Sequence, residues 1–246
     1  MTHGAAISAR SDHEPRSVQS YARLAGILGL ISVVAGGFGE GYVPTVMLVA
    51  GDAAATAQRI LGQESLFRWG FAGFLVESLC DATLTMAFWV LVRPVHRNLA
   101  MLMVVLRIIS TCGFAAAQVF HFGALTTLRT APSLAALPPG QAEALAYLLL
   151  RIGGFGGALF STFYGVANVL FGGLLYRSRL VPRAFGVAMV ITGVAFALRT
   201  FLLILAPRYA SVLLLATAPL AIIPLIAWLL VKGVDEEAWR RAERAA

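Results

Sequence analysis

Charged residues are scarce in this sequence. Asp, Glu, Lys and Arg make up 13% of its 246 residues, whereas hydrophobic residues make up 59%. Soluble domains carry roughly 25% charged residues, so this composition excludes an ordinary water-soluble domain. Because a transmembrane helix needs about 20 apolar residues, the length allows about five to seven spans and leaves no room for a separate soluble domain.

Residues that many cofactors require are also missing. The single lysine, Lys232, lies at the end of an apolar segment, which excludes a retinal protein with its lysine in mid-span. The sequence has no histidine pairs for a bis-haem cytochrome and no ligand cluster for zinc or di-iron. It also has no G-x-S-x-G motif and no phosphate-binding glycine loop. We therefore predict no cofactor, no metal and no catalytic residues.

Six apolar segments follow one another between short loops rich in Gly, Pro or Arg. We predict transmembrane helices over Tyr21–Ala50, Leu66–Val92, Asn98–Leu128, Ala142–Tyr176, Val181–Leu205 and Tyr209–Val231. The first ends in a Gly-rich, polar exit around Gly36–Pro44, and the fourth is long enough that it must tilt or project. The expected fold is an all-α integral membrane bundle whose successive helices pack as antiparallel neighbours.

The two ends of the chain differ from this six-span domain of residues 21–233. Residues 1–20 are polar and lack an apolar period, which predicts a disordered cytoplasmic tail. Residues 234–246 predict a short interfacial helix in which Trp239 suits the headgroup level. Its predicted i,i+4 ion pairs are Glu236 with Arg240 and Glu237 with Arg241.

Positive charge is concentrated on one side of the predicted bundle. Twelve Lys and Arg residues flank the spans on the side of the two termini, and four flank them on the other side. Because basic loops stay in the cytoplasm, both termini are predicted to be cytoplasmic and the number of spans even. The net charge of +7 thus reflects helix ends, and no basic patch predicts a nucleic-acid partner.

Charged side chains inside the spans form the candidate site, because each costs a few kcal/mol at bilayer depth unless it is paired or hydrated. In the second span, Glu77 and Asp81 lie four residues apart and share one face. The third span carries one narrow polar stripe, formed by Arg107, Thr111, Phe114, Gln118 and His121. Two adjacent helices therefore each present a polar stripe.

The tight turn at Pro94 makes the second and third spans a hairpin and so relates their depths. At a rise of about 1.5 Å per residue, Asp81 and Arg107 lie roughly 18 and 15 Å from the ends of this turn, near mid-membrane. An ion pair between Asp81 and Arg107 is the simplest arrangement that makes both charges tolerable.

Glu77 then lies one turn nearer the outside, where Arg151 of the fourth span or Arg199 of the fifth could meet it. Gln118, His121 and Glu40 also belong to the outer half. The residues predicted to line an outward-opening polar cavity are Glu77, Asp81, Arg107, Gln118, His121, Arg151 and Arg199.

Small residues recur every four positions in the fourth span, at Gly153, Gly157, Ser161 and Gly165. This spacing lets helix backbones approach closely. We expect these residues to mediate helix packing, and a homo- or hetero-oligomer through this span is an alternative use.

Several short stretches together resemble one protein family. They are Tyr21–Gly26, Gly51–Ala57, Glu64–Arg68, Asp81, Val92–Val95, Arg97–Ala100, Tyr176–Ser178, Leu180–Arg183, Gly186 and Leu229–Gly233. Over residues 21–233 the chain resembles the bacterial family named domain of unknown function 4386. The resemblance implies a six-span bacterial membrane protein and implies no activity.

The chain departs from that family in its fourth span. Members often carry a histidine early in this span and another near its end, where this chain has Arg151–Gly157 and Asn168. The resemblance therefore does not imply a histidine-based site here.

Three functional hypotheses follow from the residues. The first is a non-enzymatic protein whose polar cavity binds or passes a small solute or protons, with Asp81 and Arg107 at its centre. The second is a structural or assembly subunit, in which the charges only hold the helices together. The third is a membrane-embedded enzyme acting on a lipid, with Glu77 or His121 as acid or base.

Overall fold

The computed structural model describes residues 18–130, 138 and 140–245. Six of its helical segments are long and apolar enough to cross a membrane: Val18–Met47, Glu64–Val92, Arg97–Thr130, Gln141–Ser178, Arg183–Leu205 and Val212–Val231. No strand occurs among the described residues. The predicted all-α, six-span fold is thereby confirmed, while most of the predicted tail and third loop lie outside the described residues.

The first span remains helical where the sequence predicts a polar exit. It consists of α1 (Val18–Gly36), a π-helical segment (Gly37–Tyr42) and α2 (Val43–Met47). Pro44 has no N–H, and its ring crowds the carbonyl four residues earlier, which belongs to Glu40. The wider π turn accommodates this, since the Val43 N–H reaches back to the Phe38 carbonyl.

A short helix, α3 (Ala53–Gly62), occupies the segment that the sequence predicts as the first loop. Asp52 caps it, because its side chain accepts a hydrogen bond of 2.8 Å from the Ala55 N–H. The later spans are α4 (Glu64–Val92), α5 (Arg97–Thr130), α6 (Gln141–Ser178), α7 (Arg183–Leu205) and α8 (Thr217–Val231). The sixth span differs from its prediction at its start, where a 3-10 turn over Val212–Ala216 precedes α8.

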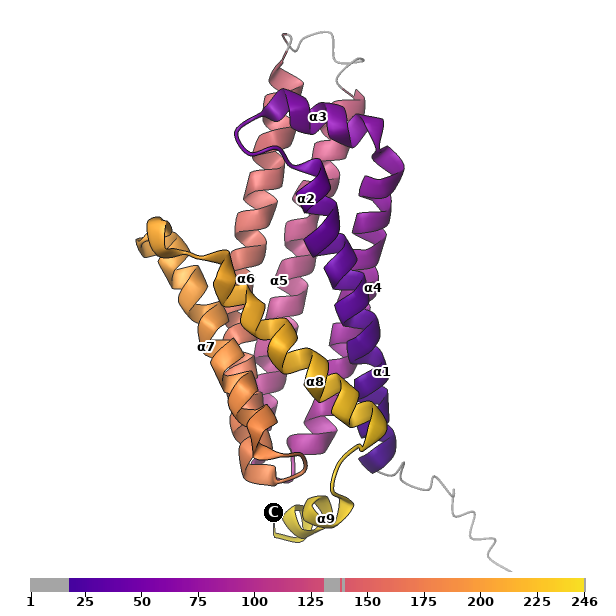
Figure 1. The fold of residues 1–246 in the computed structure, drawn as a ribbon, viewed down its shortest axis with the longest axis vertical. Helices are drawn as coiled ribbons and strands as arrows, with labels where there is room; N and C mark the ends of the chain where they lie inside the picture. The colour runs from indigo at the N-terminus through magenta and orange to yellow at the C-terminus, as the bar shows by residue number, and fades with distance from the viewer. Residues whose placement is uncertain (1–17, 131–137, 139, 246) are drawn as a thin grey trace, which may run out of the picture.

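The six spans form a closed ring in chain order. Each of α1, α4, α5, α6 and α7 packs against the next, and α8 packs against both α7 and α1. Figure 1 shows α1, α4, α5 and α6 nearly upright, α7 splayed outward and α8 crossing obliquely. Short connections explain this order, because they leave successive helices as antiparallel neighbours. The predicted neighbour relations are confirmed.

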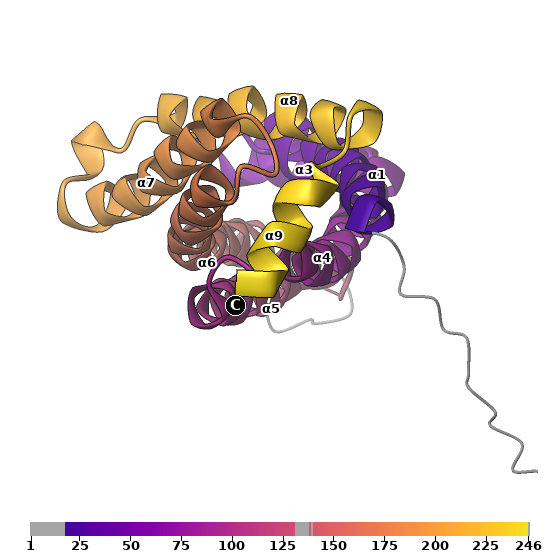
Figure 2. The ribbon, with the colours of Figure 1, turned by 90° about the horizontal axis from the view of Figure 1, so that it is seen from below.

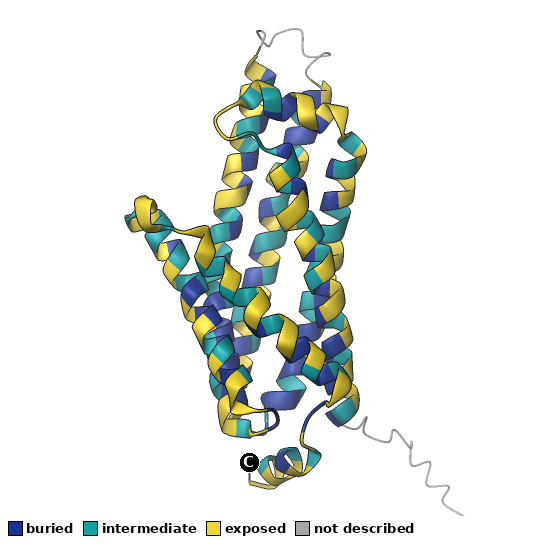
Figure 3. Ribbon diagram, in the orientation of Figure 1, coloured by how far each residue is buried: buried dark blue, intermediate teal, exposed yellow. Residues whose placement is uncertain are grey.

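Two apolar cores fill different levels of this ring. The lower core joins all six spans and includes the stacked rings of Phe88 and Phe171, whose centroids lie 4.2 Å apart. The upper core packs α2 and α3 against α4, α5 and α6 around residues such as Ile60 and Phe67. Exposed residues face outward along the helices (Figure 3). On α4 the acidic residues Glu77 and Asp81 fall between the two cores.

The two ends of the described chain meet at one end of the bundle. The Gln19 amide donates to the Lys232 carbonyl at 3.1 Å and accepts from the Val234 N–H at 3.1 Å. The chain then forms α9 (Glu236–Ala245), which crosses beneath the bundle (Figure 2). Val90 has Pro94 four residues later, so its carbonyl lacks a helical donor, and the Trp239 indole N–H donates to it at 3.2 Å.

The predicted ion pairs of this last helix are present. Arg240 lies 3.7 Å from Glu236, and Arg241 lies 3.6 Å from Glu237. Both pairs are largely exposed, so they support the helix only weakly.

Candidate functional site: an intramembrane cavity

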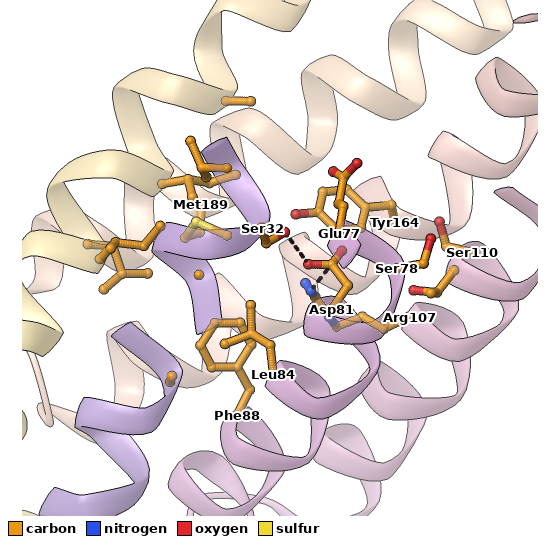
Figure 4. Close-up of a pocket in the computed structure, with 18 of the residues that line it drawn as sticks. Ser32, Glu77, Ser78, Asp81, Leu84, Phe88, Arg107, Ser110, Tyr164 and Met189 are labelled. Carbon is orange, nitrogen blue, oxygen red and sulfur yellow. Dashed lines mark hydrogen bonds and ion pairs between the residues drawn. The ribbon is translucent and has the colours of Figure 1, made fainter. Parts of the chain in front are cut away.

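A cavity of about 250 Å³ lies inside the ring of helices, and all six spans contribute to its wall. Its polar wall comes mainly from α4, α5 and α6, and its apolar wall comes mainly from α8 (Figure 4). A water molecule in a liquid occupies about 30 Å³, so the volume admits several waters or one small solute. The cavity residues used below are Ser32, Glu40, Glu77, Ser78, Asp81, Phe88, Arg107, Phe114, Tyr164, Met189, Phe196, Ile222, Leu225 and Leu229.

Asp81 lies at the centre of the polar wall. Its Oδ1 accepts a hydrogen bond of 2.9 Å from the Ser32 hydroxyl of α1, and its Oδ2 lies 3.7 Å from Nη2 of Arg107. Figure 4 shows the Asp81 carboxylate between these two partners. The ion pair that the hairpin depths predict is thus confirmed.

Arg107 is almost completely enclosed, with 2% of its surface exposed. Its Nε donates to the Thr85 hydroxyl at 3.0 Å and its Nη1 donates to the Asn168 amide oxygen at 3.3 Å. The guanidinium carbon lies 4.9 Å from the ring centroid of Tyr164 and 5.4 Å from that of Phe88. Polar groups therefore bind its nitrogens, and two aromatic rings lie within cation–π distance of it.

Glu77 lies one helical turn from Asp81 and differs from it in having no cation beside it. Its Oε2 is buried and has no hydrogen-bond partner among the described residues. Gly36 provides the space for this carboxyl, because a methyl group at that position would overlap it. Glu77 is therefore held inside the bundle with its charge uncompensated by a direct ion pair.

Glu40 is a third carboxyl at this site. It lines the same cavity, and its carboxyl lies close enough to those of Glu77 and Asp81 for their charges to interact. The sequence places Glu40 in the outer half but does not predict it as a site residue. The π-helical segment around it is the reason, because the turn of Glu40 relative to α1 cannot be read from a regular helical period.

The charges of the cavity wall do not balance. Among the described residues that line it, Glu40, Glu77 and Asp81 are acidic, and Arg107 is basic. One guanidinium cannot offset three carboxylates, and like charges at close range disfavour joint ionisation. The cavity thus requires water, protons or an added cation to compensate its excess negative charge.

Gln118 and His121 do not join this cavity. They line a second, small cavity of about 30 Å³ near Met47, Phe67 and Leu150 in the upper core. The His121 Nδ1 is buried there without a hydrogen-bond partner among the described residues. The structure therefore separates these two predicted site residues from Glu77 and Asp81, because α5 rises past the cavity before it reaches them.

Arg151 and Arg199 do not meet Glu77, so that part of the prediction is wrong. Arg151 is exposed on α6, and Arg199 is half-buried on α7; neither lines the cavity. Neither forms an ion pair with another described residue. Helix depth can be estimated from a sequence, whereas the rotation of α6 and α7 depends on how their glycines pack.

The small residues of α6 pack within the chain. A methyl group added at Gly153 or Gly157 would meet His121 or Phe114 of α5, and one added at Gly165 would meet the Gly193 backbone of α7. A methyl group added at Gly173 would meet nothing within 4 Å. Close helix packing is thus confirmed, and an oligomer through this span stays a prediction that would use its open side.

The comparisons with known proteins place the chain in a family without assigning it a reaction. No curated protein and no solved structure matches it. One family model matches residues 24–233, which is most of the chain and agrees with the range of the resemblance. The chain therefore belongs to the family described as domain of unknown function (DUF4386).

Proposed function

We propose that this protein is a multi-pass protein of the cytoplasmic membrane, and that its cavity binds or passes a small solute or protons at Glu77 and Asp81. One observation carries the proposal: Glu77 has a buried carboxyl oxygen without a partner among the described residues, in a cavity of about 250 Å³. Buried polar groups are normally paired, and intramembrane carboxyls commonly mark ion or solute pathways.

A purely structural role explains only part of this arrangement. Arg107 with Asp81, Thr85 and Asn168 ties α4, α5 and α6 together, and an ion pair would suffice for that purpose. Such a structural role does not need the additional carboxyls of Glu40 and Glu77, which place further negative charge near Asp81. These two groups favour a binding role.

The orientation of the chain in the membrane is part of the same proposal. Both ends of the described chain lie at one end of the bundle, joined by the contacts of Gln19. The Lys and Arg bias of twelve to four favours the cytoplasm for that end. In this orientation Glu77 lies on the outer side of Asp81.

The other two hypotheses lack a comparable observation. An enzyme that acts on a lipid would have to use Glu77 or His121 without the other, because the two residues line different cavities. An assembly subunit would use the lipid-facing surface, where exposed apolar residues are expected in any membrane protein.

Carbodiimide labelling tests whether the cavity carboxyls take up protons. N,N′-diisopropylcarbodiimide is small and apolar, and it modifies protonated carboxyl groups. We expect an adduct at Glu77, detected by mass spectrometry of the protein in lipid nanodiscs, that decreases as the pH is raised. Glu64 is the control on the same helix, because it lies outside the cavity and has Arg68 and Arg129 at 2.7 and 3.5 Å from its carboxylate. Equal labelling of Glu64 and Glu77, or no labelling of the cavity carboxyls, would contradict the proposal.

A further inference from the structure

We propose that the solute of this cavity is a small organic cation with an apolar body, and that it exchanges with a proton held by the cavity carboxyls. The inference rests on the proposed function and narrows it to one class of solute. It follows from three features of the wall. The nitrogens of Arg107 already face protein groups, the Glu40 and Glu77 carboxyls have no ion pair with another described residue, and the side opposite them is apolar.

Arg107 offers little to an anion. A guanidinium has five N–H donors in a fixed plane, and here its three nitrogens face Thr85, Asn168 and Asp81. Phe88 and Tyr164 also contact it through their rings, and 2% of its surface is exposed. An anionic solute would have to displace Asp81, which leaves a buried carboxylate unpaired.

Glu40 and Glu77, by contrast, line the cavity without an ion pair to another described residue. The ionisable groups that line the cavity with Glu77 are Glu40 of the π-helical segment, Asp81 of α4, Arg107 of α5 and Tyr164 of α6, and those that interact with Glu77 are Glu40 and Asp81. The described cavity residues of α1, α7 and α8 are uncharged. An ammonium group placed beside Glu77 would supply the positive charge that this side of the wall lacks.

The rest of the wall suits an apolar body. Ile222, Leu225 and Leu229 of α8 present one apolar face to the cavity, and Met189 of α7 extends it. The aromatic rings of Phe88, Phe114, Tyr164 and Phe196 also contribute, and such rings attract ammonium groups as well as apolar surface. Ligand pockets usually measure about 300–1,000 Å³, so this cavity limits the solute to a small one.

Exchange with a proton follows from the charge balance. Without a solute, at least one cavity carboxyl carries a proton, because Arg107 offsets one negative charge. When R–NH₃⁺ binds, that carboxyl becomes the carboxylate partner of the ammonium group, and its proton passes to water. One cation enters and one proton leaves, so the charge of the site is unchanged.

Binding of three probes of nearly equal shape tests the inference: benzylammonium, benzyl alcohol and benzoate. We expect the wild-type protein in nanodiscs to bind benzylammonium about tenfold or more tighter than the other two in equilibrium dialysis. In weakly buffered solution, a pH-indicator dye should report proton release on benzylammonium binding. Glu77→Gln should weaken benzylammonium binding about tenfold, whereas Glu64→Gln, on the same helix outside the cavity, should leave it unchanged.

The outcomes separate this inference from the proposed function. If benzyl alcohol binds as tightly as benzylammonium, the preference for a cation is wrong, whereas the proposal that the cavity binds a small solute stands. Tightest binding of benzoate would contradict the inference that Arg107 offers little to an anion. Binding of none of the three, together with carbodiimide labelling of Glu77, would overturn the organic cation and leave proton binding. The ranking of the three probes needs only the wild-type protein, so it decides the question even if Glu77→Gln fails to fold.

Discussion

At the scale of single residues, the site depends on how differently its charges are satisfied. Arg107 contacts an anion, two neutral oxygens and two aromatic rings, whereas the Glu77 Oε2 has no hydrogen-bond partner among the described residues. A buried charge is tolerated only when its surroundings replace the water it has lost. Arg107 meets this condition within the protein, whereas the Glu77 Oε2 does not, and Glu40, the other carboxyl that interacts with Glu77, supplies no positive charge.

Removal of Arg107 should therefore cost more than removal of Asp81. Arg107→Met leaves three carboxyls without a cation, and we expect it to lower the free energy of unfolding by about 3–5 kcal/mol, the range for breaking a buried pair. Asp81→Asn keeps an amide oxygen in place of the carboxylate and leaves Arg107 with Thr85, Asn168 and two aromatic rings, so the loss should be of order 1–2 kcal/mol.

Thermal unfolding of the detergent-solubilised variants measures this difference. Arg107→Lys serves as a comparison, since it keeps the charge but cannot reach three partners from one ammonium group while stacking on two rings. It should fall between Arg107→Met and the wild type. Equal destabilisation by Arg107→Met and Asp81→Asn would contradict the asymmetry.

Much of the residue-level site could be predicted from the sequence, and the reason is geometric. The tight turn between α4 and α5 and the constant rise of an α-helix together give Asp81 and Arg107 similar depths, and the two residues form the expected ion pair. Rotation about a helix axis is not fixed in this way, so the prediction that Arg151 and Arg199 join the site is wrong. Ser32 gives no signal in the sequence, because a serine in an apolar helix commonly bonds its own backbone.

At the scale of helices, α6 and α7 are held together by two pairs of glycines. Gly165 faces Gly193 and Gly172 faces Gly186, and at each the backbone of one helix lies where a side chain of the other would be. The two pairs are seven residues apart on both helices, which matches two helical turns. This packing sets the rotation of α7 and so directs Met189 and Phe196 into the cavity.

Adjacent glycines of α6 offer a matched test of this contact. A methyl group at Gly172 would lie 2.5 Å from the Gly186 carbonyl oxygen, whereas one at Gly173 would meet nothing within 4 Å. Gly172→Ala should lower stability by about 1–3 kcal/mol through overpacking. Gly173→Ala should be neutral or stabilising by up to about 1 kcal/mol, because Ala favours the helix. Equal effects of the two substitutions in thermal unfolding would contradict the close approach.

The sequence predicts that these glycines pack but does not predict against which helix. Small residues at four-residue spacing are compatible with a neighbour in the same chain or with a second copy. The sequence also predicts the end of the first helix near Gly37–Tyr42, where the structure has a π-helical segment. Gly and polar residues before Pro44 are typical of a helix end as well as of a π turn, so the two cannot be told apart from the sequence.

At the scale of the whole molecule, the closed ring of six helices explains why a cavity exists. Because α8 packs at the edges of α1 and α7, its inner face stands opposite α4 and α5 across open space. The upper core and the α9 contacts close the bundle at its two ends. The polar groups of the cavity thus lie between two apolar cores.

The proposed orientation gives a direct prediction for reporter fusions. A green fluorescent protein fused after Ala246 should fluoresce, and alkaline phosphatase at the same place should be inactive, because that end is cytoplasmic. A truncated fusion after Gly140, which follows the third span, should give the opposite pair of results. Active phosphatase at the C-terminal fusion would contradict the orientation.

Reaction of water-soluble thiol reagents with two neighbouring positions on α4 tests the account most directly. Ser78 lines the cavity, whereas Leu79 is 71% exposed on the outer surface at nearly the same depth. In a variant whose Cys80 and Cys112 are replaced by Ala, a methanethiosulfonate reagent should modify Ser78→Cys several times faster than Leu79→Cys, because thiols ionise where they meet water. Equally slow modification of both would mean that the interior is dry, and Asp81 and Glu77 would then have no solute or proton pathway to serve.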